Sequence, residues 1–267
     1  MRNISNKVAM KPRSALSLSG INAALYSCTE NTGTTLTDAF DLAASAAIGG
    51  TAGTQLTSTP GWLTLNGSDN YVNLPGSLFP AISDGHAHLF AFSLYHGADN
   101  GSTETIIDLG SNSTTDGIFR LSVNATGGLQ LSTRGVGGSA NTAQTFGTFD
   151  MTAYNTVAAG ASIAVLVRAI VGLTAVADLY VNNAYVSQLS LDFSANSGTA
   201  WARVSTNNYV RLGALVGTAS TFLGGGTANS RIRNILSYRQ TTYDATKMAA
   251  AIRQHHLYKG EKIRGLV

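Results

Sequence analysis

One short segment holds the clearest group of side chains that could bind a ligand. Tyr95, His96, Asp99 and Asn100 supply an aromatic ring, an imidazole, a carboxylate and an amide close together in the chain. A sugar ring stacks on an aromatic face while its hydroxyls bind carboxylates and planar amides, so these residue types suit a glycan. The alternative interpretation is a polar turn with Tyr95 packed inward.

A second group combines Trp201 and Tyr209 with the amides of Asn207 and Asn208. It offers a glycan the same ring and amide chemistry from another expected loop. Large aromatic side chains are mostly buried in folded proteins, so a place in the core is the competing interpretation for both rings. The sequence alone does not say which loops lie together.

Two acidic residues in expected turns, Asp69 and Asp99, are the candidates for a calcium site. Calcium takes carboxylate, amide and carbonyl oxygens from loops, but the same side chains also shape turns through local hydrogen bonds. His86 and His88 would share one strand face and could join His96 at a metal, although metal sites usually need more ligands. We therefore expect no cofactor, with calcium as the one candidate.

Patterns typical of catalysis are sparse. Glu104 and Asp108 could share a strand face, but we expect them at a solvated edge. Asp108 and Asp116 are kept as a pair that could converge in space for polysaccharide hydrolysis. Neither a Gly-x-Ser-x-Gly nucleophile turn nor a Gly-x-x-x-x-Gly-Lys phosphate loop occurs, and the single Cys28 is expected to be a small buried residue. We expect a protein that is not an enzyme.

The distribution of charged residues along the chain limits the kinds of partner that the protein could bind. Charged residues make up 12% of the 267, against about 25% in a typical soluble protein, and the net charge is +3. The first 13 residues carry basic but no acidic side chains, at Arg2, Lys7, Lys11 and Arg13, and a second basic segment ends the chain. The body between them is mildly acidic, unlike the basic folded face of a nucleic-acid-binding domain. The basic arm is expected either to dock on an acidic partner or to be a solvated tail.

The elements that must position these side chains are short strands. Short apolar or alternating runs recur between turns rich in Gly, Asn and Ser, for example at 71–74, 118–123 and 185–191. Asn66-Gly67 marks one hairpin. About a dozen such strands without intervening helices are typical of an all-β sandwich or barrel.

One helix is expected near 242–257, opened by a capping box that runs from Thr241 to Asp244. His255 and His256 in its last turn would complement the helix dipole. Residues 43–58 are rich in Ala, Gly, Ser and Thr, which indicates a long loop with at most a weak strand.

Three segments carry motifs of a known family. Residues 65–74 follow the pattern F-x-G-x-x-D-Y-V-x-L of a hairpin, and residues 178–183 follow L-Y-V-N-G, with Asn183 where glycine is usual. Residues 231–238 follow a closing strand of the form G-x-I-D-D-V-x-I-Y. In this order the motifs resemble those of the concanavalin A-like, laminin-G-like superfamily.

The resemblance implies an all-β fold, a two-sheet antiparallel jelly-roll sandwich with one short C-terminal helix. It divides the chain into an extended basic arm over 1–24, the jelly-roll domain over 25–258 and a basic tail over 259–267. The superfamily includes lectins, glycanases, adhesion modules and virus structural proteins, so the fold does not by itself fix a function.

Composition favours one of these classes. A neutral β chain rich in Ser, Thr, Asn and Gly, with a basic N-terminal arm and no signal peptide, resembles bacteriophage proteins of the tail-fibre, receptor-binding or head-decoration type. We therefore expect a non-enzymatic structural protein of a virion, made in the host cytoplasm, that contacts other virion proteins through its arm and host glycans through its loops. A homo-oligomer such as a trimer is expected, without nucleic-acid partners or membrane insertion. The alternatives are a free-standing lectin or adhesion module and, second, a polysaccharide hydrolase.

Overall fold

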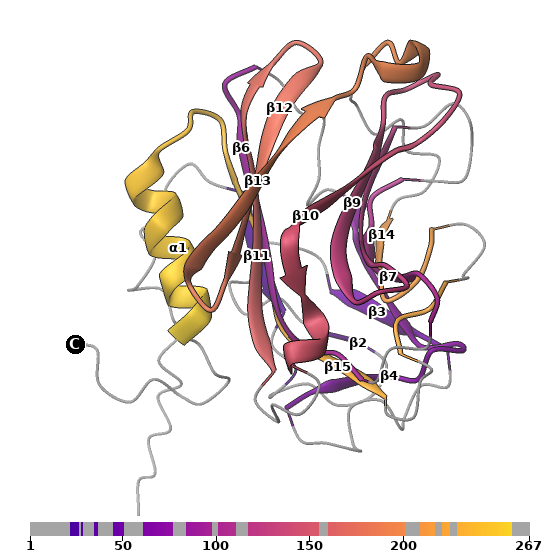
Figure 1. Ribbon diagram of the computed structural model, residues 1–267. Coiled ribbons are helices and arrows are strands. Elements are labelled where there is room, and N and C mark those ends of the chain that lie inside the picture. Colours follow the sequence, from indigo (N-terminus) through magenta and orange to yellow (C-terminus); the bar gives the residue numbers. More distant parts are fainter. Residues whose placement is uncertain are drawn as a thin grey trace, which may run out of the picture.

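The computed structural model confirms the expected sandwich: two antiparallel sheets face each other, and one helix lies outside them (Figure 1). The structure describes residues 22–26, 28, 35–36, 45–50, 61–76, 84–97, 101–110, 117–154, 160–200, 209–216, 221–224 and 229–257. No helix in these ranges is both long and apolar enough to cross a membrane.

Sheet A carries the helix. Its strands run in the order β1 (Asn22–Tyr26), β15 (Ser230–Gln240), β6 (Ala87–Tyr95), β11 (Ala161–Val171), β12 (Thr174–Val181) and β13 (Ala184–Asp192). A seventh strand, β4 (Leu63–Leu65), pairs with the first residues of β15. Strands far apart in sequence thus lie side by side, as a jelly roll requires.

Sheet B forms the other layer. Its order is β10 (Thr142–Asp150), β9 (Gly128–Arg134), β8 (Ile118–Val123), β7 (Glu104–Asp108), β14 (Tyr209–Leu212), β5 (Tyr71–Pro75), β3 (Ala46–Gly49) and β2 (Thr35–Leu36). Two short 3-10 helices, η2 (Met151–Tyr154) and η3 (Ala195–Ser197), lie in connections.

The core lies between the sheets because alternate residues of each strand point inward. On β6 these are Phe90, Phe92 and Leu94, and across the gap they share one buried cluster with Leu121 of β8 and Val210 of β14. The single Cys28 is buried in the same cluster, as expected, and burial raises the pKa of its thiol to about 12.

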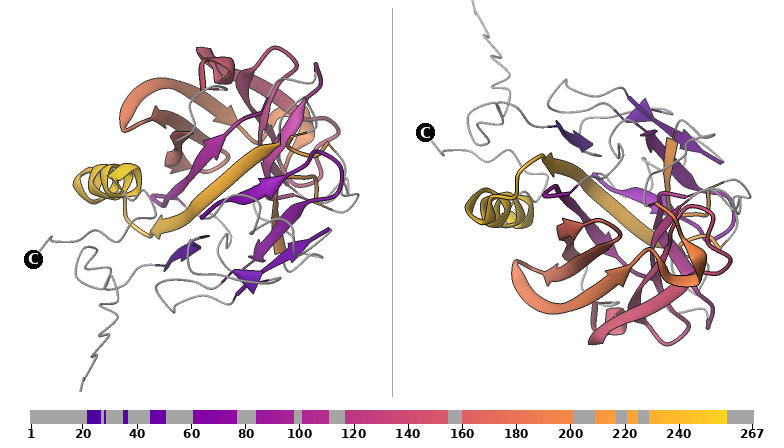
Figure 2. Two further views of the ribbon diagram at one scale, coloured as in Figure 1. Left: turned by 90° about the horizontal axis from the view of Figure 1, so that it is seen from below. Right: turned by 90° about the horizontal axis from the view of Figure 1, so that it is seen from above.

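The intervening residues point to the outer face of sheet A, part of which is also apolar. Leu89 and Ala91 of β6 and Leu166 of β11 share a second buried cluster with Met248 and Ile252 of α1 (Ala245–Leu257). Both views of Figure 2 place this helix outside the sandwich. Because the helix covers it, β6 is buried on both faces and shows little alternation in sequence.

The helix begins later than the sequence analysis predicts, and the expected capping box is wrong. Asp244 is itself the N-terminal cap: its Oδ1 accepts a hydrogen bond from the Lys247 amide at 3.0 Å. The amide of Asp244 in turn donates to Oε1 of Gln240 at 2.8 Å. These bonds fix the start of α1 against the end of β15.

His255 has a different role from the expected one. It is 3% exposed and packs between α1 and sheet A, so it is not simply a surface complement to the helix dipole. Its Nε2 donates to the carbonyl oxygen of Asn234 at 2.7 Å, which leaves Nδ1 to accept from the Ser162 hydroxyl at 3.0 Å. Burial lowers the pKa of His255 from 6.5 to about 4, so the imidazole is neutral.

Sheet B contains one strand that the sequence pattern concealed. In β10 only Phe146 is buried, so no apolar series marks a nine-residue strand. The weak strand allowed within 43–58 exists as β3, where Ala46 and Ile48 alternate with more exposed residues.

Candidate functional site

Three tyrosines and three polar side chains lie together on the outer face of sheet A, close to the start of α1. The hairpin of β12 and β13 supplies four of them, β11 supplies one, and the last directly precedes the helix. We call this group the tyrosine surface, and its members are Arg168, Asp178, Tyr180, Tyr185, Gln188 and Tyr243.

The hairpin brings Tyr185 to this face through a tight turn and a bulge. Asn182 and Asn183 have φ angles of 50° and 66°, which a two-residue type I′ turn requires. The register then shifts so that Tyr180 pairs with Tyr185, while Val186 packs against the core between the sheets. Simple alternation from Gln188 would have put Val186 outside instead.

A buried carboxylate holds the polar part of the surface in place. Asp178 binds the Arg168 guanidinium through both oxygens, with Nη2 of Arg168 3.2 Å from Oδ1, and Nε donating to Oδ2. Nε2 of Gln188 donates to the same Oδ1 at 2.7 Å. The Asp178 side chain is 1% exposed whereas that of Arg168 is 28% exposed. The hydrogen bonds to Asp178 raise the pKa of Arg168 and keep it charged.

The rings around this network differ in exposure. Tyr185 is 57% exposed and Tyr243 is 38% exposed, and these are the only aromatic side chains among the exposed large hydrophobic residues of the described ranges. Tyr180 is partly buried and lies edge-on to Tyr185, with 5.7 Å between the ring centroids. The Arg168 guanidinium lies 5.8 Å from the Tyr243 ring centroid. Burial, and then the Asp178 charge, raise the pKa of Tyr180, so its hydroxyl stays protonated.

This arrangement offers the chemistry that a sugar needs. Exposed aromatic faces bind the apolar face of a pyranose ring, and guanidinium, amide and phenol groups bind hydroxyls. The buried acid holds the guanidinium of Arg168 and the amide of Gln188, which reduces the entropy lost when a ligand orders these two groups. No acid of this group is free to act as a catalyst, because both oxygens of Asp178 are engaged.

The structure describes only two of the four predicted loop residues. Tyr95 ends β6 half-buried, and the guanidinium of Arg231 covers its ring at 4.0 Å. His96 is fully buried, with Nε2 3.1 Å from Oε2 of Glu104. Asp99 and Asn100 lie outside the described residues. Their prediction as a ligand site therefore stays a prediction.

The other predicted positions are also untested. Trp201 and the arm residues Arg2, Lys7, Lys11 and Arg13 lie outside the described residues. Tyr209 starts β14 opposite Pro75, and only its backbone is described.

Asp69 serves a local turn. Its Oδ1 accepts a hydrogen bond from Nδ2 of Asn66 at 2.6 Å, and Oδ1 of Asn66 accepts the Asp69 amide at 3.2 Å. Within the described ranges no group of three or more His, Cys, Asp or Glu is placed to hold a metal. His88 lies near the start of β6 and His96 directly follows its end, eight residues on, which separates them by roughly 27 Å along an extended chain.

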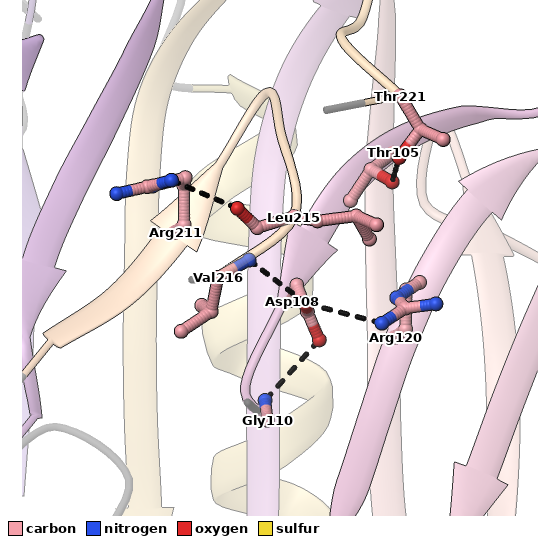
Figure 3. Close-up of polar contacts among 8 residues, drawn as sticks. All are labelled: Thr105, Asp108, Gly110, Arg120, Arg211, Leu215, Val216 and Thr221. Carbon is pink, nitrogen blue, oxygen red and sulfur yellow. Dashed lines mark hydrogen bonds and ion pairs between the residues drawn. The ribbon is translucent and has the colours of Figure 1, made fainter. Parts of the chain in front are cut away.

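The expected solvated edge for Glu104 and Asp108 is wrong, since these residues are 1% and 0% exposed. Oε2 of Glu104 accepts the Gly224 amide at 3.0 Å in addition to its contact with His96. Figure 3 shows Asp108 reaching from β7 toward Gly110, Val216 and Arg120. It accepts the amides of Gly110 and Val216 at 3.2 and 3.0 Å and faces Nη2 of Arg120 at 3.3 Å.

These two carboxylates hold the chain that follows β14 against β7. The Arg211 guanidinium donates to the Leu215 carbonyl at 2.8 Å, and the hydroxyls of Thr105 and Thr221 are 2.8 Å apart (Figure 3). Burial raises the pKa of Asp108, and the Arg120 charge opposes that shift. The sequence pattern could not show this role, because the amides of Val216 and Gly224 come from residues more than a hundred positions away.

Comparison with known proteins supports the fold. No protein-family model matches the chain, and no curated protein sequence matches it. Among solved structures, botulinum neurotoxin type C, whose cell entry depends on interaction with two ganglioside molecules, matches with a TM-score of 0.54 at 13% identity. The alignment covers 87% of this chain and 50% of the toxin chain.

Two further structures show the same likeness. The binding domain of botulinum neurotoxin DC in complex with SialylT aligns with a TM-score of 0.52 at 12% identity, covering 85% of this chain and 52% of the toxin chain. A Trypanosoma rangeli sialidase aligns with a TM-score of 0.52 at 12% identity, covering 89% and 33%. The chain thus spans about half of the toxin structures and a third of the sialidase. The chain shares with them a β-sandwich fold.

Proposed function

We propose that this protein is a non-enzymatic, lectin-like binding module that holds a glycan against the tyrosine surface. One observation carries the proposal: two exposed aromatic rings lie in one group with a guanidinium that a buried carboxylate fixes in place. Tyr243 lies beside that guanidinium, and Tyr185 lies edge-on to Tyr180 on the same face. Ring faces beside oriented polar groups are the combination that sugar recognition uses. The neighbours that bind gangliosides and SialylT support the choice of ligand class.

A glycan array of the purified protein tests the proposal, with ganglioside oligosaccharides and neutral oligosaccharides on the same slide. Tyr185→Ala and Tyr243→Ala should each weaken binding to the selected glycan by roughly fivefold, since one ring contact contributes about 1 kcal/mol. Leu257→Ala is the matched control, because Leu257 is 49% exposed at the far end of α1. Equal binding by all three variants would refute the site.

The finer part of the proposal places this module on a virion, as a tail-fibre, receptor-binding or head-decoration component. The low charge, the neutral polar composition and the basic residues 1–13 support it. Many copies on one particle would compensate for a weak single site through multivalency. Mass spectrometry of purified virions tests this placement, and a free-standing lectin would be missing from them.

Release of reducing ends from capsular polysaccharide would instead favour the hydrolase alternative. Among the described residues Asp108 does not support that alternative, because backbone amides and Arg120 engage both of its oxygens.

A further inference from the structure

A separate group of nitrogen atoms lies where β6 begins and β15 ends. Nδ1 of His86, Nε2 of His88 and Nε of Arg239 are all buried, and none has a hydrogen-bond partner in the structure described here. His88 is 7% exposed as a whole residue. Buried polar atoms are normally paired, so three unpaired nitrogens in one place indicate a ligand or an ordered water.

The sheet register brings these side chains to one face. His88 pairs directly with Arg239 across the antiparallel strands, and directly opposed residues point to the same side. His86 directly precedes β6, and it interacts electrostatically with both His88 and Arg239, which places it beside them. The face is the inner one, because Phe90 follows His88 in the same series and belongs to the core between the sheets. The three side chains therefore meet at the end of the sandwich.

The guanidinium of Arg239 gives this group a positive charge, and no acidic side chain among its described neighbours pairs with it. Burial and the Arg239 charge lower the pKa of His88 to about 3, and the same two causes lower the pKa of His86. The nearest described acid in sequence is Asp84, and its Oδ1 is engaged by the Gly172 amide at 2.6 Å. Val167, which opposes His88 on β11, carries no charge.

We propose that His86, His88 and Arg239 form a binding site for an oxyanion, namely a carboxylate, sulfate or phosphate group. A planar guanidinium binds such groups through parallel hydrogen bonds, and two imidazoles add donors once the anion is present. The anion would raise the basicity of both imidazoles, so its binding takes up protons and strengthens as the pH falls. This site is independent of the tyrosine surface and of the function proposed for it.

Nuclear magnetic resonance of protein carrying ¹⁵N-labelled histidine tests the site. Sodium sulfate is titrated at pH 6.5 against sodium chloride of matched ionic strength, and sodium glucuronate forms a second arm. We expect sulfate to shift the ring signals of His86 and His88 saturably, and to leave those of His96 and His255 unchanged. Saturation by glucuronate at lower concentration than by sulfate would identify an acidic sugar, rather than an inorganic ion, as the source of the oxyanion.

Variants supply the control. Arg239→Gln should weaken sulfate binding by roughly tenfold or more, because it removes the one permanent charge. Arg253→Gln on α1, outside this group, should bind sulfate like the parent protein. Shifts that do not saturate, shifts equal to those in chloride, or unchanged affinity in folded Arg239→Gln protein would each overturn the proposal in favour of a buried water.

Discussion

Asp178 has two roles at the tyrosine surface, since it is a buried charge that needs partners and it also orients those partners toward solvent. Asp178→Ala would leave the Arg168 guanidinium without its counterion in a half-buried position. Loss of one partner from such a pair destabilises a protein by about 3 kcal/mol. Urea unfolding should show that loss, and glycan binding should fall with it. A variant with unchanged urea midpoint and unchanged binding would contradict this role.

Asp108 is likewise a buried carboxylate that needs partners, but none of its partners is exposed. Asp108→Ala leaves two amides and the Arg120 guanidinium without their acceptor, so we expect a loss of about 3–5 kcal/mol in unfolding free energy. Hydrogen exchange should quicken at Val216, whose amide loses its acceptor. Asp192→Asn is the control, because Asp192 binds only adjacent residues such as Ser194 at an exposed turn, and its urea midpoint should not move.

His255 gives stability a pH dependence with a definite sign. Its pKa is about 4 in the folded protein and 6.5 when unfolded, so below pH 6.5 the unfolded chain takes up a proton that the folded one refuses. Stability from this residue is complete above pH 6.5, and about 2 kcal/mol is lost by pH 4.5. Urea unfolding of His255→Gln at pH 7 and pH 4.5 should show a smaller loss than the parent protein; an equal loss would assign the effect to other groups such as His88.

At the scale of elements, α1 is held by its apolar face. Ile252 is 3% exposed in the cluster between the helix and sheet A, so Ile252→Ala should cost about 2–4 kcal/mol. Leu257→Ala on the exposed side of the same helix should change stability by less than about 0.5 kcal/mol. Thermal unfolding of the two variants distinguishes the stability that comes from packing α1 against sheet A from the stability that comes from helix propensity. Equal losses of stability in the two variants would contradict the packing.

Strands can be predicted from the sequence where at least one face is buried, and they cannot where neither face carries an apolar series. The alternation in β5 and the Asn182-Asn183 turn of the β12–β13 hairpin follow from local sequence. β10 escaped notice because only Phe146 enters the core. The helix start was misplaced because Asp244 caps it directly, and the cap bond was not distinguishable from a capping box by spacing alone.

The site was harder to predict than the fold. Asp178 and Tyr180 are two residues apart in a strand and therefore lie on one face, but only the bulge at Val186 puts Tyr185 beside them. Arg168 and Tyr243 join from β11 and from the residues before α1, and no local pattern links those segments. The local sequence points to loops instead, because polar and aromatic residues stand out where glycines interrupt strands.

For the whole molecule, the central claim is that a glycan binds the outer face of sheet A at the tyrosine surface. The most direct measurement is a nuclear magnetic resonance titration of protein with ¹³C-labelled tyrosine rings, using the glycan that the array selects. We expect saturable shifts for Tyr185 and Tyr243, smaller shifts for Tyr180, and none for the buried Tyr26 and Tyr238. Binding that shifts Tyr95 or Tyr209 while Tyr185 and Tyr243 stay unchanged would contradict it, and would return the site to the loops.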